Sequence, residues 1–123
     1  MIESQTLFLY VADPAVSARA YAALLGIEPI DASPTFALFS LPSGLALGLW
    51  ASDEVQPAPV AAGGGSEIGF RVGSPADVDA IHAEWLEKGA RIAFPPTDLG
   101  FGRSFVAIDP DGHRLRVYAI ARL

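Results

Sequence analysis

The stretch from Phe101 to Ala119, FGRSFVAIDPDGHRLRVYA, decides how the rest of the chain is interpreted. Two runs rich in β-branched and aromatic residues flank the tetrapeptide Asp-Pro-Asp-Gly at residues 109–112. Proline fixes φ and glycine accepts a positive φ, so the tetrapeptide predicts a tight turn. We therefore expect strands at about 103–108 and 114–119, joined as a hairpin.

The composition narrows the class of protein. The chain has 123 residues, of which 51% are hydrophobic, which is enough for a core. It contains no cysteine, which excludes disulfides, thiolate metal sites and a cysteine nucleophile and suits a reducing compartment. The net charge of −6 argues against nucleic acid as a partner. No apolar run reaches the roughly 20 residues of a membrane span, and MIESQTLFLY lacks the basic start of a signal peptide. We expect a cytoplasmic protein.

The first half of the chain reads as a strand, a helix and three more strands. Thr6–Val11 has strand composition, and Asp13-Pro14 is typical of a helix start, with Asp as N-cap. The helix is expected to end near Leu25, because Gly26 is a natural C-terminal stop. Three strands follow, at about 28–31, 35–41 and 45–51.

Residues 55–66, VQPAPVAAGGGS, separate the two halves and predict a linker, because their prolines and glycines cannot sustain a helix or strand. The same plan then repeats. A strand at 67–72 precedes a helix that Ser74-Pro75 begins and Gly89 ends. Three strands follow, at about 90–94, 103–108 and 114–119. We expect the first helix to bury Val16, Ala20, Ala23 and Leu24, and the second to bury Val78, Ile81, Trp85 and Leu86.

The repetition predicts an internal duplication and an α+β fold. The two βαβββ modules would span residues 1–54 and 67–123, with the linker at 55–66 between them. One helix covers only one face of a four-stranded sheet. We therefore expect two curved sheets to face each other across a cavity.

Paired βαβββ modules ending in Asp-Pro-Asp-Gly resemble the vicinal oxygen chelate superfamily, which includes glyoxalase I, extradiol dioxygenases and bleomycin-binding proteins. Within it, the chain resembles the phenazine-antibiotic resistance proteins, which bind their drug without a metal. The segments that carry this resemblance are SEIGFRV at 66–72, ADVDAIHAEW at 76–85 and TDLGFGRSFVAIDPDGHRLRV at 97–117. It implies a homodimer, in which modules of two chains combine to build the cavities.

Metal-dependent members of the superfamily place four His, Gln or Glu ligands at positions that correspond here to Thr6, Gly48, Glu67 and Arg116. Only Glu67 could bind a divalent cation, and a shift of register that brings in Gln5 adds one more ligand. We therefore expect no metal and no other cofactor. His113 reads as a polar residue beside the turn and His82 as a partly exposed helical residue, and no nucleophile, phosphate-loop or dinucleotide motif is present.

Strand alternation assigns the side chains that would line the cavity. In the first strand Leu7, Leu9 and Val11 form the core set, and the other set faces the cavity. Small residues leave room, aromatic rings offer stacking surfaces, and an arginine can bind a carboxylate through two hydrogen bonds. The predicted ligand-binding residues are Phe8, Tyr10, Phe36, Gly48, Trp50, Glu67, Arg71, Arg103, Phe105, Arg116 and Tyr118. Ala46, Gly69 and Arg114 share the inward set.

Structural alternatives stay open for several of these residues. Trp50 could fill a hydrophobic gap, Glu67 could pair with Arg71, and Arg103 could brace the loop before its strand. The Gly-rich segment around Phe101 could be a lid or a plain turn.

We expect a metal-free protein that binds a planar aromatic compound, such as a phenazine- or bleomycin-like antibiotic, and protects by sequestering it or by passing it to an exporter. No bond would be made or broken. The enzymatic alternative is a glyoxalase-type lyase or isomerase that uses Glu67 as a base, with a weakly held metal. A third reading is a module without a ligand that serves as an interaction partner.

Overall fold

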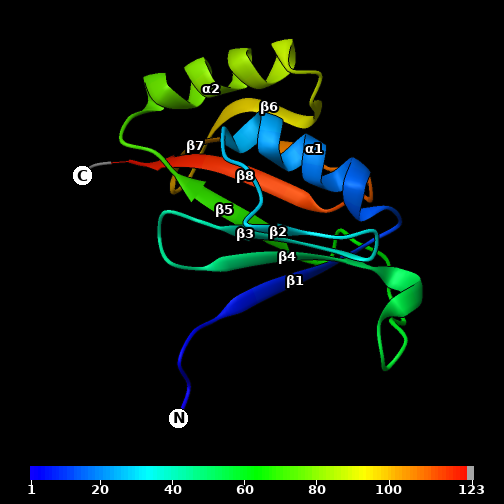
Figure 1. Ribbon diagram of the computed structural model, residues 1–123. Helices are drawn as coiled ribbons and strands as arrows, with labels where there is room; N and C mark the ends of the chain where they lie inside the picture. Colours follow the sequence, from blue (N-terminus) through cyan, green and yellow to red (C-terminus); the bar gives the residue numbers. More distant parts are fainter. Residues whose placement is uncertain (122–123) are drawn as a thin grey trace. The chain divides into compact units, whose positions relative to one another are not determined.

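The first half of the chain forms a four-stranded sheet with one helix against it (Figure 1). The computed structural model describes residues 1–121, which divide into two compact units between Gly63 and Gly64. The division falls within residues 55–66, which contain no helix or strand. The elements of the first unit are β1 (Thr6–Val11), α1 (Pro14–Leu25), β2 (Asp31–Ala32), β3 (Phe36–Ser40), β4 (Ala46–Ala51) and the 3₁₀ turn η1 (Ser52–Glu54).

The strands of the first sheet run in the order β1-β4-β3-β2. β1 pairs with β4 in parallel, and the remaining pairs are antiparallel. α1 begins as expected, because Asp13 accepts a hydrogen bond from the backbone N–H of Ala15 at 3.0 Å. It ends at Gly26, which adopts a φ of 68° and donates its N–H to the carbonyl of Ala22 at 2.9 Å.

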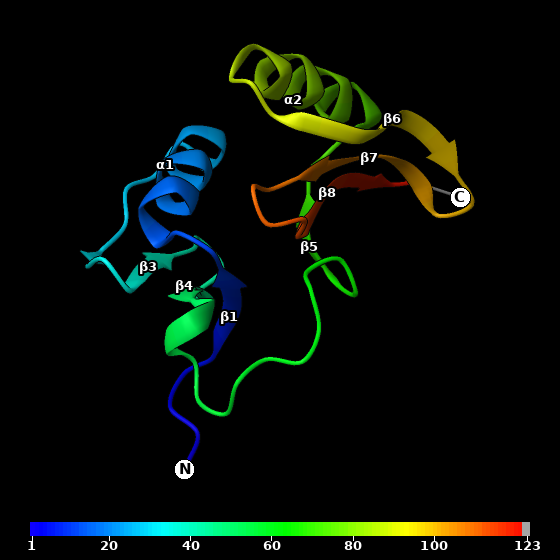
Figure 2. The same cartoon turned by 90° about the vertical axis from the view of Figure 1, so that its right-hand side faces the viewer.

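The second unit repeats this architecture (Figure 2). Its elements are β5 (Glu67–Arg71), α2 (Pro75–Glu87), β6 (Arg91–Leu99), β7 (Gly102–Ile108) and β8 (Arg114–Ile120), and its strand order is β5-β8-β7-β6. The predicted α+β fold of two βαβββ modules is confirmed. Neither helix within residues 1–121 combines the length and apolar character that crossing a membrane requires.

The Asp-Pro-Asp-Gly tetrapeptide forms the predicted turn between β7 and β8. Gly112 donates its N–H to the carbonyl of Asp109 at 3.1 Å and has a φ of 87°. The Asp109 carboxylate, 4% exposed, accepts hydrogen bonds from the backbone N–H groups of Asp111 and His113 at 2.8 and 2.9 Å. These contacts hold the last two strands in register, so the turn has a structural role.

Each sheet buries one face beneath its own helix. In the first unit that face carries Leu9 and Val11 of β1 and Leu47 and Leu49 of β4, all less than a tenth exposed. In the second unit Trp85 of α2 packs edge-on against Phe105 of β7, with ring centroids 5.4 Å apart. We call the opposite surface of each sheet its helix-free face.

The predicted buried face of α1 is only partly right, since Ala20 and Leu24 are half-buried. Val16 is 40% exposed and Ala23 is exposed, whereas the helix buries Pro14, Ser17, Ala18 and Tyr21. The cause is the alanine-rich sequence, in which several rotations of the helix expose similar hydrophobicity. The one large aromatic ring, Tyr21, decides which rotation fills the core. In α2, Val78 and Trp85 are buried as predicted, Ile81 is half-buried, and Leu86 is 50% exposed, contrary to prediction.

Two strand boundaries also differ from prediction. β2 has only two residues, and β6 continues past Phe94 to Leu99 through Pro95 and Pro96. Proline removes a backbone donor, which an edge strand at a bulge tolerates. β6 is such an edge strand, and its pairing with β7 shifts register between Ile92 and Phe94 and between Phe94 and Thr97.

Candidate functional site

The helix-free face of the first sheet carries a cluster of aromatic rings. Strand register aligns Tyr10 of β1, Trp50 of β4 and Phe36 of β3 in one row across the sheet. Phe8 lies in the adjacent row, and its ring centroid is 5.7 Å from Trp50 and 6.2 Å from Phe36. Trp50 meets Tyr10 at 6.4 Å and Phe36 at 6.5 Å, both edge-on. The aromatic cluster is therefore Phe8, Tyr10, Phe36 and Trp50.

Gly48 forms the floor of this cluster. A Cβ at this position would lie 2.9 Å from Cδ1 of Phe8 and 3.0 Å from the ring of Phe36. The absence of a side chain at Gly48 lets the two rings close over the backbone. Phe8 is 47% and Tyr10 40% exposed, so the cluster presents ring surface as well as internal contacts.

The strand alternation predicted for β1 is confirmed, since Leu9 and Val11 are buried and Phe8 and Tyr10 are exposed. Phe36 joins the same face because its register partner is Trp50. Trp50 is half-buried among the rings.

The helix-free face of the second sheet is organised around Glu67. Arg116 donates from Nε to Oε1 at 2.5 Å and from Nη2 to Oε2 at 3.3 Å, a two-bond contact between guanidinium and carboxylate. Its third nitrogen, Nη1, donates to Oγ of Ser104 at 2.9 Å. Arg114 approaches the same carboxylate, with Nε 3.3 Å from Oε2. Glu67 thus pairs with Arg116 and Arg114, and not with Arg71, the alternative that the sequence left open.

Tyr118 and Arg71 lie at the β5 side of this face. The Tyr118 ring lies over Gly69, and a Cβ at Gly69 would lie 3.1 Å from Cε1 of this ring. Tyr118 also packs edge-on against Phe101, with ring centroids 6.2 Å apart. Arg71 is exposed, and its side chain makes no hydrogen bond or ion pair with any residue of the described range 1–121. Phe101 belongs to a two-residue connection between β6 and β7. Of the two alternatives for the Gly-rich segment, a lid or a plain turn, the structure therefore has the turn.

An open pocket of about 320 Å³ lies on the second unit. Its lining combines four apolar side chains with two guanidinium groups: Ala93, Phe94, Leu99, Ile108, Arg114 and Arg116. Pockets of this size and mixed character are typical of small-molecule sites.

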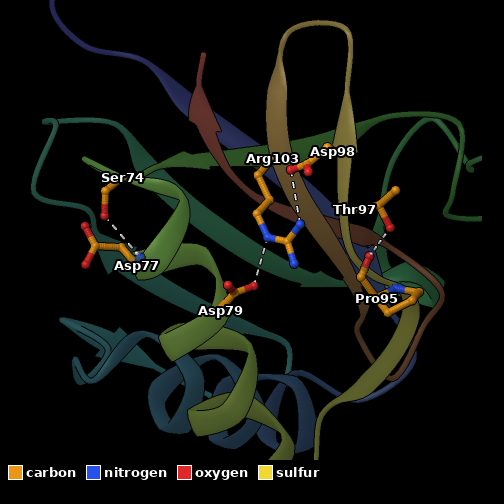
Figure 3. Close-up of polar contacts among 7 residues, drawn as sticks. All are labelled: Ser74, Asp77, Asp79, Pro95, Thr97, Asp98 and Arg103. Carbon is orange, nitrogen blue, oxygen red and sulfur yellow. Dashed lines mark hydrogen bonds and ion pairs between the residues drawn. The ribbon is translucent and has the colours of Figure 1, made fainter. Parts of the chain in front are cut away.

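The ligand-binding role predicted for Arg103 disagrees with its placement (Figure 3). Register pairs Arg103 with Asp98 of β6, and its side chain bridges to α2. Nε donates to Asp79 at 2.9 Å and Nη1 to Asp98 at 3.1 Å. The hydrogen bond that Arg103 donates to Asp79, followed by the one that it donates to Asp98, raises the pKa of the Arg103 guanidinium above its ordinary value. Arg103 therefore braces α2 against the edge strand β6, a structural role different from the expected bracing of the loop before its strand.

Phe105 is also misassigned. It shares the parity of Val117, its register partner, and lies beneath α2, with no exposed surface. His82 contacts it edge-on at 5.2 Å and Trp85 at 5.4 Å. The error arose because the parity of β7 depends on the exact start of the strand, which the Gly-rich segment before it does not define.

The residues at the four metal-ligand positions of the superfamily do not fit a divalent cation. Gly48 offers no side-chain donor, Arg116 is cationic, and both oxygens of Glu67 receive hydrogen bonds from Arg116. Within residues 1–121 no group of three or more His, Cys, Asp or Glu side chains is arranged to hold a metal ion. We derive no step through a metal.

Prediction from the sequence missed part of this site. Arg114 was assigned to the inward set but not to the ligand, and Phe94, Leu99 and Ser104 were not assigned at all. Ser104 could have been found by strand alternation. Val106 pairs with the inward-facing Arg116, and Ser104 lies two residues before Val106 on the same face of β7. Phe94 and Leu99 could not, because the bulges in β6 interrupt its alternation.

The two βαβββ modules define the class of fold, and sequence comparison identifies its family. Residues 4–117 match the Glyoxalase/Bleomycin resistance protein/Dioxygenase superfamily, and the chain belongs to this superfamily. The predicted superfamily is confirmed.

Individual proteins similar to this chain give more detail than the superfamily match. The chain is 31% identical over 113 residues to the phenazine antibiotic resistance protein EhpR of Enterobacter agglomerans, a match that covers 89% of this chain and 85% of that protein. Protein ATC0852 of Agrobacterium tumefaciens, solved by NMR, is 44% identical with a TM-score of 0.85 and covers 99% of this chain and 100% of its own. A glyoxalase-related enzyme from Fulvimarina pelagi has a TM-score of 0.84 at 20% identity, over 97% of this chain and 88% of that one, which shows the shared fold.

Proposed function

We propose that this protein binds a planar aromatic small molecule of the phenazine type without a metal, and confers resistance by sequestering it or by passing it to an exporter. The observation that carries the proposal is the aromatic cluster on the first sheet, which leaves two of its rings two-fifths or more exposed above a glycine floor. Similarity to the phenazine antibiotic resistance protein EhpR supports the chemical class of the ligand.

The physical basis is ring stacking on a fixed surface. The rings of the cluster hold one another at centroid distances of 5.7 to 6.5 Å, so little side-chain freedom is lost when a ligand binds. Each aromatic pair contributes about 0.5–1.5 kcal/mol beyond the burial of its surface. Two such pairs, together with burial of a tricyclic ring, would be sufficient for micromolar affinity, about −8 kcal/mol.

The lyase alternative lacks a comparable observation. A general base must lie within hydrogen-bond reach of the proton that it abstracts, whereas both carboxylate oxygens of Glu67 accept hydrogen bonds from Arg116. A substrate proton would have to compete with this two-bond contact.

Binding is tested by calorimetric titration of the purified protein with phenazine and related tricyclic compounds. We expect saturable binding that Trp50→Ala weakens about tenfold, as loss of one or two ring contacts predicts. Val16→Ala is the matched control, because Val16 is an exposed apolar residue on α1, against the opposite face of the sheet. Equal affinity of wild type and Trp50→Ala would overturn the stacking model.

Sequestration is tested by the fate of the compound. We expect the phenazine to be recovered chemically unchanged after prolonged incubation with the protein, as shown by mass spectrometry. Turnover of methylglyoxal and glutathione in the presence of added divalent cations, abolished by Glu67→Gln, would favour the lyase instead.

A further inference from the structure

The helix-free face of the second sheet is positively charged, although the chain has a net charge of −6. By register, the strand residues on this face include four arginines, at positions 71, 91, 114 and 116. Glu67 is the acid among them. Arg103, on the other face, is neutralised by Asp79 and Asp98. Positive charge is therefore concentrated where the pocket lies.

Arg114 and Arg116 both line the pocket but differ in their hydrogen bonds. Arg116 is committed, because all three of its guanidinium nitrogens donate to Glu67 or Ser104 and its side chain is only 18% exposed. The guanidinium of Arg114 donates no hydrogen bond to any atom of residues 1–121, and its Nε is buried without a hydrogen-bond partner. Its side chain is 41% exposed.

The positive charge of Arg114 and Arg116 is only partly neutralised by the acid beside them. Two guanidinium groups share the single carboxylate of Glu67, and Arg116 already makes the two-bond contact with it. One positive charge remains, and Nη1 and Nη2 of Arg114, which make no hydrogen bond within residues 1–121, are the donors that can bind a second carboxylate.

The rest of the pocket is apolar. Phe94, Leu99 and Ile108 flank the two arginines in a volume of about 320 Å³. An inorganic anion would leave these walls unused, and a neutral ring would leave Nη1 and Nη2 of Arg114 without an acceptor. A flat aromatic ring that carries one carboxylate satisfies both halves of the pocket.

We propose that the pocket selects aromatic monocarboxylates, and that Arg114 is the residue that binds the ligand carboxylate, with Arg116 and Glu67 holding it in position. This inference rests on the proposed binding of planar aromatic compounds, but it concerns the pocket of the second unit and not the aromatic cluster of the first.

The test compares phenazine-1-carboxylate with phenazine-1-carboxamide by calorimetry at pH 7, where the acid is ionised and the amide is neutral. We expect the wild-type protein to prefer the acid by about tenfold or more, as a charge-assisted contact predicts. Arg114→Gln should reduce this preference to within about twofold. Lys88→Gln, which removes one charge at the end of α2 against the other face of the sheet, should retain it.

The outcomes separate the two proposals. Equal affinity of the wild type for acid and amide would overturn the carboxylate preference while leaving aromatic binding in place. A preference that survives in Arg114→Gln would overturn the role of Arg114. Failure of the wild type to bind either compound would overturn the proposed function and this inference with it. If Arg114→Gln does not fold, which circular dichroism detects, Arg114→Lys replaces it, and we expect a reduced preference because a single ammonium group lacks the planar fork.

Discussion

Gly48 shows how one missing side chain can shape an aromatic surface. Rings from two neighbouring strands, Phe8 of β1 and Phe36 of β3, close over its backbone on β4. A larger residue would hold the rings apart, and Trp50 would lose part of its support. Gly48 is therefore needed for the close approach of the two rings, and not for its backbone conformation, because its φ is not positive.

We predict that Gly48→Ala leaves the fold intact but disturbs the aromatic cluster. The new Cβ would lie about 3 Å from both rings, which must move, at a cost of about 1–2 kcal/mol that better strand propensity partly offsets. Near-ultraviolet circular dichroism should show a changed tryptophan signal, and affinity for a phenazine should fall. Gly65→Ala, with open space around its Cβ, is the control. An unchanged spectrum and affinity would show that the rings do not depend on the glycine.

Sequence reasoning at the residue scale succeeded where alternation is regular and failed where it is interrupted. The parity of β1, β4, β5 and β8 placed eight of the predicted ligand-binding residues on helix-free faces: Phe8, Tyr10, Gly48, Trp50, Glu67, Arg71, Arg116 and Tyr118. β7 starts after a glycine-rich turn, so a shift of one residue was enough to misplace Phe105 and Arg103. The ion pairs of Glu67 depend on side-chain geometry, which alternation does not specify.

At the scale of elements, the hairpin between β6 and β7 depends on Gly102. This residue has a φ of 147°, and a Cβ would lie 1.9 Å from the carbonyl oxygen of Ala119 on β8. The neighbouring backbone is fixed as well, because Ala121 donates its N–H to the carbonyl of Phe101 at 2.8 Å. The close approach of the two strands leaves no room for a side chain.

We predict that Gly102→Ala destabilises the second unit by about 3 kcal/mol or more, through strained backbone and displacement of β8. Gly100→Ala, two residues away with open space and no positive φ, should have little effect. Trp85 is buried in the second unit, so in a Trp50→Phe background its fluorescence reports urea unfolding of that unit. Equal unfolding midpoints for the two alanine variants would contradict the close contact.

Predicting whole elements from the sequence was most reliable where caps and turns mark them. Asp13, Ser74 and Gly26 define helix ends through their own hydrogen bonds or backbone conformation, and the 109–112 turn defines a hairpin. The extent of β6 was underestimated because Pro95 and Pro96 normally end a strand. The rotation of α1 was misjudged because an alanine-rich helix contains little information on which side is buried.

At the scale of the whole molecule, each unit covers only one face of its sheet with its own helix. In the first unit this leaves Phe8 and Tyr10 with 47% and 40% of their surface exposed, next to the rest of the aromatic cluster. Clustered exposed aromatic surface is typical of an interaction site. A second copy of the chain could cover such a surface and exclude water from a ligand held there, which strengthens stacking and charge-assisted contacts alike.

We therefore predict that the protein is a homodimer in solution and that each chain binds one ligand. Light scattering during gel filtration should give twice the mass of the chain over a wide concentration range, and ligand should slow dissociation of the dimer, because binding to the assembled form stabilises it. Tyr10→Glu introduces a charge into the exposed aromatic surface and should shift the protein toward single chains, whereas Leu86→Glu, at an exposed position on α2, should not. A wild-type protein that is monomeric at every concentration yet binds phenazine with full affinity would show that one chain suffices, and the exposed rings would then serve the ligand alone.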